Sequence, residues 1–225
     1  ITTEVRDANL FRLFAYDITY LQMKIAEINP LSTVIVCYDG IYGRRPRGAL
    51  YPEYKQNRRG GAIATKHKGI DVRYKIKRTK HDPEGLVLGW QYEYDDNKEA
   101  DDLIAELCIS LPDDEEIIVM SKDGDLIQLM ALPNVSLHDF TIPITDDLIM
   151  EKYGITPSQY LDFKALVGDK SDNIPGIKGI GPATAKKYLS EYDTIDNFPQ
   201  ELLAEADISK ANLWKRISTL PFHQY

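Results

Sequence analysis

Hydrophobic residues along the chain predict an alternation of helices and short strands. Between residues 10 and 28 they recur every three or four positions, which is the period of a helix, and Pro30 ends the run. Continuous apolar runs at residues 34–38 and 117–120 predict buried strands. Shorter strands are expected at residues 90–94 and 135–137. This order of elements indicates an α/β fold.

Capping signals place further helices in the second half of the chain. Apolar residues from position 100 to 107 have helical spacing, and Pro112 ends that helix. Beyond residue 193 we expect a helical remainder with Trp214 and Phe222 in its core. The other helices are expected to begin at Thr145, at Thr156-Pro157 and at Gly181-Pro182, the second of them ending at Gly168.

The length of 225 residues allows a core of ordinary size, in one domain or in a domain with a small appendage. No apolar run approaches the roughly 18 residues of a membrane-spanning helix, and no secretory signal pattern opens the chain. Cys37 lies in a predicted strand and Cys108 on an apolar helix face, so both are expected to be reduced core residues. We therefore expect a cytoplasmic protein.

Charge is distributed unevenly along the chain. The net charge is −8, yet residues 41–80 contain thirteen Lys and Arg against two acidic residues. A basic arm on an acidic body suits a protein that grips phosphates with one part and holds metal ions with another. The alternative is a solvated charged surface, although such surfaces usually alternate the two signs.

Carboxylates gather where the predicted elements begin or end. The segment Glu99-Ala100-Asp101-Asp102 opens a helix, whereas Asp39 and the segment 121–125, with Asp123 and Asp125, follow strands. Ligands of open parallel sheets bind beyond the carboxyl ends of the strands, so we expect these groups to converge. Two carboxylates about 5 Å apart repel by roughly 3 kcal/mol at an effective dielectric of about 20, which favours a pair of Mg²⁺ or Mn²⁺ ions. Helix-dipole and turn preferences are the alternative explanation.

Tyrosine rings alternate with cations in the basic arm. Arg44, Arg45 and Arg47 precede the segment 51–59, in which Tyr54 lies among Lys and Arg residues. This mixture suits backbone phosphates with bases stacked on rings, as in single-stranded nucleic acid. Residues 72–77 alternate apolar and cationic side chains, so a short ribbon there and disorder around residues 60–61 both remain open.

A glycine-rich segment at residues 168–182 lies between two predicted helices. Its alternating glycines allow tight turns and close approach to a phosphate. Gly181-Pro182 then opens a helix whose free N–H groups favour an anion, and Lys186 and Lys187 follow on it. We interpret the segment as a hairpin that reads DNA backbone and not sequence; a plain glycine turn is the alternative.

Five motifs, in this order, resemble the signatures of the 5′-nuclease superfamily. That superfamily includes flap endonucleases, bacteriophage 5′–3′ exonucleases and the 5′-nuclease domain of bacterial DNA polymerase I. The match extends from about residue 39 to residue 189. The motifs are Asp39-Gly40, residues 54–58, residues 99–102, residues 121–125 and residues 168–185.

The resemblance implies a mostly parallel central sheet flanked by helices (PIN-like), an arch and a helix–hairpin–helix element. We expect residues 1–145 to form the α/β nuclease core with a basic arch at about 41–85. Residues 146–225 would form a helical region with the helix–hairpin–helix at about 158–190. The arch of the family leads into an amphipathic helix for which Gly60-Gly61, Pro83 and Gly85 leave no room. We therefore expect an arch that is shortened, rebuilt as a ribbon or incompletely represented in this sequence.

The resemblance also implies roles for individual residues. Lys55 and Arg58 match arch residues that contact the scissile phosphate, and Asp123 is a third expected catalytic residue. Ile177 and Ile180 match backbone that binds a monovalent cation, often K⁺. Two Mg²⁺ or Mn²⁺ ions are organised, directly or through water, by Asp39, Glu99, Asp101, Asp102, Asp123, Asp125, Asp169 and Asp172. The expected DNA-binding set is Arg44, Arg45, Arg47, Tyr54, Lys55, Arg58, Arg59, Lys178, Gly179, Gly181, Thr184, Lys186 and Lys187.

We expect, from this resemblance, a monomeric metal-dependent 5′–3′ exonuclease or flap endonuclease that hydrolyses phosphodiester bonds near 5′ ends. Its substrates would be DNA flaps or forks, or RNA primers annealed to DNA, in replication or repair, with replication proteins as partners. Family members begin with a strand that carries one more metal-binding Asp, and we expect that strand upstream of Ile1. The alternative is a non-catalytic DNA-binding module of the same fold that lacks this Asp.

Overall fold

The computed structural model describes residues 23–28, 32–58 and 91–222. The chain divides into two compact units, one of residues 1–36 with 61–93 and one of residues 37–60 with 94–225. Residues 23–28 are helical, as the pattern at 10–28 predicts. The remainder of that helix, the ribbon at 72–77 and the glycines at 60–61 lie outside the described residues. All the candidate site residues discussed below belong to the second unit.

Strands β1 (Ile35–Tyr38) and β2 (Gln91–Tyr94) pair in a two-stranded sheet. They confirm the strands predicted at residues 34–38 and 90–94. The chain turns sharply after β1, where the backbone N–H of Gly40 donates to the carbonyl of Lys98 over 2.8 Å. A Cβ atom on Gly40 would lie 2.1 Å from the carbonyl oxygen of Asp95, so this close approach requires glycine. Asp39 is thereby held beside the segment that leads into the acidic helix.

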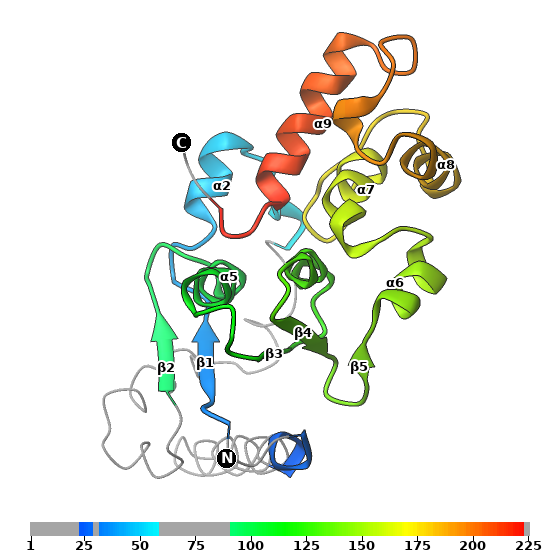
Figure 1. Cartoon of the computed structure of the whole chain (residues 1–225). Coiled ribbons are helices and arrows are strands. Elements are labelled where there is room, and N and C mark those ends of the chain that lie inside the picture. Colours follow the sequence, from blue (N-terminus) through cyan, green and yellow to red (C-terminus); the bar gives the residue numbers. More distant parts are fainter. Residues whose placement is uncertain (1–22, 29–31, 59–90, 223–225) are drawn as a thin grey trace, which may run out of the picture. The chain divides into compact units, whose positions relative to one another are not determined.

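The second unit contains a three-stranded sheet (Figure 1). Strand β3 (Ile117–Met120) runs parallel to β4 (Val135–His138), and β4 runs antiparallel to β5 (Pro143–Ile144). The acidic helix α5 (Ala100–Ser110) ends before Pro112 as expected, and the 3₁₀ helix η3 (Gly124–Ala131) directly follows β3. The predicted α/β class is confirmed, although the strands of the described residues form two small sheets instead of one continuous sheet.

Helices form most of the C-terminal part of the second unit. They are α6 (Asp146–Tyr153), η4 (Pro157–Gln159), α7 (Tyr160–Val167), α8 (Pro182–Tyr192), η5 (Ile195–Asn197) and α9 (Glu205–Ser218). Helix α7 packs against α8 and α9 (Figure 1). Thr145 caps α6 and Thr156 caps η4, which confirms these two predicted helix starts. Gly168 ends α7 with a φ of +86°. Trp214 is buried, as predicted.

The start of the basic arm folds into a short helix that the sequence pattern does not predict. Helix α2 (Arg45–Leu50) carries Pro46 in its first turn, where the missing N–H costs nothing, and η1 (Gln56–Arg58) follows. Tyr51 packs edge-on against Trp214 of α9, with ring centroids 4.9 Å apart. Both cysteines are free thiols. Among the described helices, none is both long and apolar enough to cross a membrane.

Candidate metal centre

The N-terminus of α5 brings together carboxylates from two parts of the chain. Glu99 is the N-cap, and Asp102 accepts the backbone N–H of Glu99, which completes a capping box. Asp39, at the end of β1, accepts the backbone N–H of Ala100 over 2.9 Å. Asp39 therefore satisfies one of the free N–H groups of α5 and lies beside the motif that follows it.

A second group of carboxylates forms between η3 and the loop that follows α7. Asp125 lies in the first turn of η3, where its backbone N–H donates to the side chain of Asp123 over 3.0 Å. In the loop, Asp169 accepts the backbone N–H of Ser171 over 2.6 Å. Carboxylate oxygens of Asp125, Asp169 and Asp172 all lie within 4.8 Å of one another. Three oxygen donors at this spacing suit a hard divalent cation.

A lysine that the motif analysis did not single out lies among these three carboxylates. The Nζ atom of Lys164, from α7, lies 2.5 Å from Asp125, 2.9 Å from Asp169 and 3.2 Å from Asp172. Burial raises the pKa of Asp169, but the Lys164 ammonium and the hydrogen bonds from Ser171 together outweigh burial and lower that pKa to about 2. For Asp125, burial prevails and raises the pKa despite the lysine.

Asp101 and Asp123 form the opposite electrostatic case. None of the Lys and Arg side chains described in the structure forms an ion pair with either carboxylate. Burial, and after it the negative charge of Asp123, raises the pKa of Asp101 to about 7. A carboxylate pair with this much unfavourable charge gains stability from a bound cation.

The other two acidic residues of the motif at 99–102 pair with cations of the protein. Arg47 binds Asp102 through two hydrogen bonds of 2.7 Å and Glu99 through one of 3.1 Å. Glu99 also accepts hydrogen bonds from the Tyr54 hydroxyl over 3.0 Å and from Lys55 Nζ over 2.8 Å. Glu99 and Asp102 are thus held in fixed orientations by a buried network.

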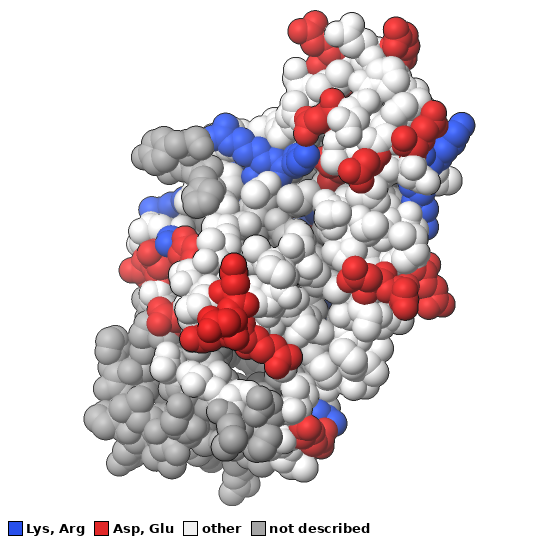
Figure 2. Space-filling view, in the orientation of Figure 1, with Lys and Arg blue, Asp and Glu red and all other residues white. Residues whose placement is uncertain are grey.

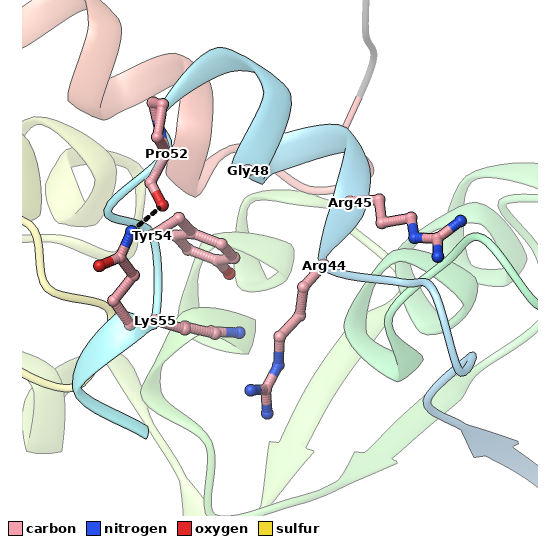
Figure 3. A pocket seen from close by; sticks show the side chains of 7 residues that line it. Arg44, Arg45, Gly48, Pro52, Tyr54 and Lys55 are labelled. Atoms are coloured by element: carbon pink, nitrogen blue, oxygen red, sulfur yellow. Dashed lines mark hydrogen bonds between the residues drawn. The ribbon is translucent and has the colours of Figure 1, made fainter. Parts of the chain in front are cut away.

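The cations predicted to meet DNA occupy different environments. Arg44 and Lys55 line a cavity of about 400 Å³ below α2, together with Tyr54 (Figure 3). Arg45 is exposed and lies over the ring of Tyr42, with its guanidinium carbon 3.7 Å from the centroid. Arg47 is buried, and its guanidinium contacts protein groups. The side chain of Arg58 and all of Arg59 lie outside the described residues.

Lys55 is held by its backbone as well as its side chain. Its φ angle is +51°, an uncommon value for a residue with a Cβ, and its N–H donates to the carbonyl of Asp172 over 2.9 Å. Its ammonium lies 3.7 Å from the carboxylate of Asp172. Lys55 therefore connects the motif at 99–102 with the group formed by Asp125, Asp169 and Asp172.

The glycine-rich hairpin presents exposed backbone next to the start of α8. Lys178, Gly179 and Gly181 are exposed, as is Lys187, whereas Lys186 and Thr184 are half-buried. The backbone N–H of Ile177 donates to Leu166, and that of Ile180 donates to Ile177 over 3.0 Å. On the face drawn in Figure 2, the described Lys and Arg side chains lie in small separate groups between acidic patches.

Lys164 and the internal role of Arg47 are the site features that the sequence analysis missed. The signal for Lys164 was present, because it falls between Tyr160 and Val167 on the apolar face of a predicted helix. A lysine on such a face needs a buried partner of opposite charge. Arg47 gave no such signal, because it lies among other arginines in an arm that is basic throughout.

Comparisons with known proteins match nearly the whole chain. Residues 13–154 match the model of the 5′-3′ exonuclease N-terminal resolvase-like domain, and residues 155–220 match that of the 5′-3′ exonuclease C-terminal SAM fold. DNA polymerase I of Mycobacterium tuberculosis is 35% identical over 175 residues, which cover 72% of this chain and 18% of that protein. Thermostable DNA polymerase I of Thermus thermophilus is 43% identical over 105 residues, covering 46% of this chain and 13% of that protein.

Solved structures share the fold of this chain. The T5 D15 protein co-crystallised with metal ions superposes with a TM-score of 0.65 at 20% identity, covering 90% of this chain and 79% of that one. A T5 5′-exonuclease with bound zinc gives 0.61 at 22% identity, covering 91% and 77%. The chain spans less than a fifth of the two polymerases. On the evidence of both domain models, the chain belongs to the 5′-3′ exonuclease family.

Proposed function

We propose that the protein is a divalent-metal-dependent, structure-specific 5′ nuclease that hydrolyses phosphodiester bonds near 5′ ends of DNA. The observation that carries the proposal is the grouping of Asp125, Asp169 and Asp172 within 4.8 Å, next to a buried lysine network. A protein that only binds DNA gains nothing from acids near phosphate. The DNA polymerases among the relatives and the metal-bound T5 structures support the same reading.

The donor set fits magnesium or manganese. The proposed ligands are all carboxylate oxygens, which hard cations prefer, and the set contains no sulfur or imidazole. They belong to Asp101, Asp123, Asp125, Asp169 and Asp172. A bound ion of this kind lowers the pKa of water and stabilises charge on a leaving oxygen. Three more carboxylates are proposed to contribute to the metal centre indirectly, through bound water or through the groups that they orient. They are Asp39, Glu99 and Asp102. Two ions are proposed because the acids form two groups.

Lys55 is proposed to act on the scissile phosphate. Its ammonium is fixed by Glu99 and by the backbone contact to Asp172, so it is oriented before substrate arrives. A cation held in this way neutralises charge that grows on phosphoryl oxygens, an effect worth on the order of 3 kcal/mol. Arg58 is proposed to share this task. Arg44 lines the same cavity as Lys55 and is proposed to bind the DNA backbone.

The hairpin at 176–181 is proposed to hold duplex DNA at its backbone. Gly179 adopts φ of +88° with open space around its Cα, so a phosphate can approach closely. The N-terminus of α8 favours an anion, and Lys178 and Lys187 are exposed beside it. A K⁺ ion coordinated by backbone near Ile177 and Ile180 is proposed to bridge to the DNA. We also propose that the protein acts on DNA flaps or forks, that it is a monomer and that it associates with bacterial or phage replication proteins.

Cleavage of a 5′-flap duplex tests the proposed function. With Mg²⁺ the protein should release the flap with a 3′-hydroxyl and leave a 5′-phosphate on the duplex strand, and EDTA should stop the reaction. Asp123→Asn should abolish turnover and leave flap binding intact, because it removes a ligand charge and little volume. Tight, salt-sensitive flap binding without cleavage at any metal concentration would instead support the non-catalytic module.

A further inference from the structure

Lys164 occupies the position that a cation would take in the group of Asp125, Asp169 and Asp172. Its side chain is 4% exposed, and its ammonium contacts one oxygen of each carboxylate at 2.5, 2.9 and 3.2 Å. An ammonium has three N–H donors, so this arrangement uses all of them. The carboxylates that it engages are the same three that would supply ligand oxygens to a divalent ion.

The two groups of acids therefore differ in how their charge is compensated. Lys164 supplies positive charge to Asp125, Asp169 and Asp172, and Lys55 lies a further 3.7 Å from Asp172. Asp101 and Asp123 have no ion pair with any described Lys or Arg. A divalent ion that approaches Asp101 and Asp123 meets carboxylates that no described Lys or Arg pairs with, whereas one that approaches the other group meets an ammonium. The electrostatic attraction for the first ion is therefore stronger.

We propose that Lys164 is a built-in competitor for divalent cations at Asp125, Asp169 and Asp172. The first ion binds at Asp101 and Asp123, and the second binds only when the Lys164 ammonium withdraws. The four-carbon stem of lysine allows such a withdrawal without movement of α7. Lys164 thus acts as a positioning residue that sets the order and the affinity of metal binding. The inference rests on the proposed metal centre and deepens it.

The same ammonium keeps the three carboxylates together when no ion is bound. Without it, carboxylate oxygens of Asp125, Asp169 and Asp172 would lie within 4.8 Å of one another and would lose the one ammonium that contacts all three. Removal of Lys164 should therefore lower the melting temperature of the metal-free protein. It should also increase the affinity of these carboxylates for a divalent ion, which would stabilise the metal-bound protein. A purely structural lysine would predict the loss of stability without the gain in metal affinity.

Titration with Mn²⁺, followed by electron paramagnetic resonance without DNA, tests the proposal. Wild-type protein should bind one ion tightly and a second weakly. Lys164→Met, which keeps the length of the stem and removes the charge, should bind the second ion at least tenfold more tightly and leave the first within twofold. Lys164→Arg, the matched control that keeps the charge, should leave the second site weak. Unchanged or weakened second-site binding in Lys164→Met overturns the proposal.

A measurement on the wild-type chain covers the case in which Lys164→Met does not fold. Reductive methylation with peptide mapping reports how accessible each lysine is. Lys164 should be protected without metal and should react at least fivefold faster at saturating Ca²⁺, whereas exposed Lys178 should react equally in both states. Equal protection of Lys164 in both states overturns the proposal. Absence of any Mn²⁺ binding to wild-type protein would overturn the metal centre itself, so the two failures are distinguishable.

Discussion

Arg47 and Asp102 form a buried, bidentate ion pair in which Nη1 and Nη2 of the guanidinium each lie 2.7 Å from a carboxylate oxygen. The pair connects α2 with the first turn of α5. Arg47 Nε also donates to the carbonyl of Ile217 in α9, and the backbone N–H of Phe222 donates to Asp102. Arg47 and Asp102 thus connect the basic arm, the acidic helix and the C-terminal segment beside the candidate metal centre.

Replacement of Arg47 by Met should destabilise the protein by about 3–5 kcal/mol, because it leaves Asp102 buried without its partner. Urea denaturation measures this change in the free energy of unfolding. Arg45→Met is the matched control, since Arg45 belongs to the same helix and is exposed. It should change stability by less than about 0.5 kcal/mol. Equal effects of the two variants would show that the ion pair contributes nothing specific.

Asp101 should make the metal-free protein less stable as the pH rises. Burial and Asp123 raise its folded pKa to about 7 from an ordinary value of 3.8, so the native state binds its proton more tightly than the unfolded state. Between the unfolded and the folded pKa of Asp101, the free energy of unfolding should therefore fall as the pH rises. Urea denaturation in EDTA at pH 5 and pH 8 should show this fall in wild-type protein and a smaller one in Asp101→Asn. A steeper fall in the variant would contradict the assignment.

Gly168 and Gly179 both have positive φ but should respond differently to alanine. A Cβ at Gly168 would lie 2.5 Å from the carbonyl oxygen of Ile174, whereas one at Gly179 would meet open space. Gly179→Ala should cost about 1 kcal/mol of backbone strain, and Gly168→Ala more than about 3 kcal/mol. Thermal unfolding of the two variants compares them directly. Similar losses would mean that the loop carrying Asp169 is less tightly closed than the structure shows.

Lys55→Met should lower kcat for flap cleavage by roughly 10²-fold, since it removes a positioned cation. Flap affinity, measured by fluorescence anisotropy, should change much less. Lys187→Met offers the comparison, because Lys187 is exposed on α8 and should affect binding and its salt dependence. A Lys55→Met protein with wild-type kcat and weakened binding would assign this lysine to the DNA backbone instead.

Periodic and capping signals predicted most elements of the described structure. The strand at 117–120, the helix after Glu99 and the helix closed by Gly168 follow directly from local patterns. The helix α2 was missed because its six residues, two of them arginines, carry no helical hydrophobic period. The division of the chain at residues 145 and 146 stays a prediction, and the two compact units of the structure divide at other positions.

Local patterns were less informative about the site, because charge pairing depends on tertiary structure. Strand ends and helix starts indicated where Asp39, Asp101, Asp123 and Asp125 would lie. They did not indicate that Glu99 and Asp102 would be held by Arg47, or that Lys164 would lie among carboxylates. The partners in each of these pairs lie far apart along the chain, so no local pattern connects them. The metal and DNA roles of the individual residues stay predictions.

Crystallographic location of Mn²⁺ by its anomalous signal tests the central claim most directly. A crystal of the protein soaked in Mn²⁺ should show one ion within about 2.3 Å of carboxylate oxygens of Asp101 or Asp123. At higher concentration a second ion should appear among Asp125, Asp169 and Asp172, with Lys164 moved away. Ions bound only elsewhere on the protein, with these carboxylates unchanged, would contradict the account.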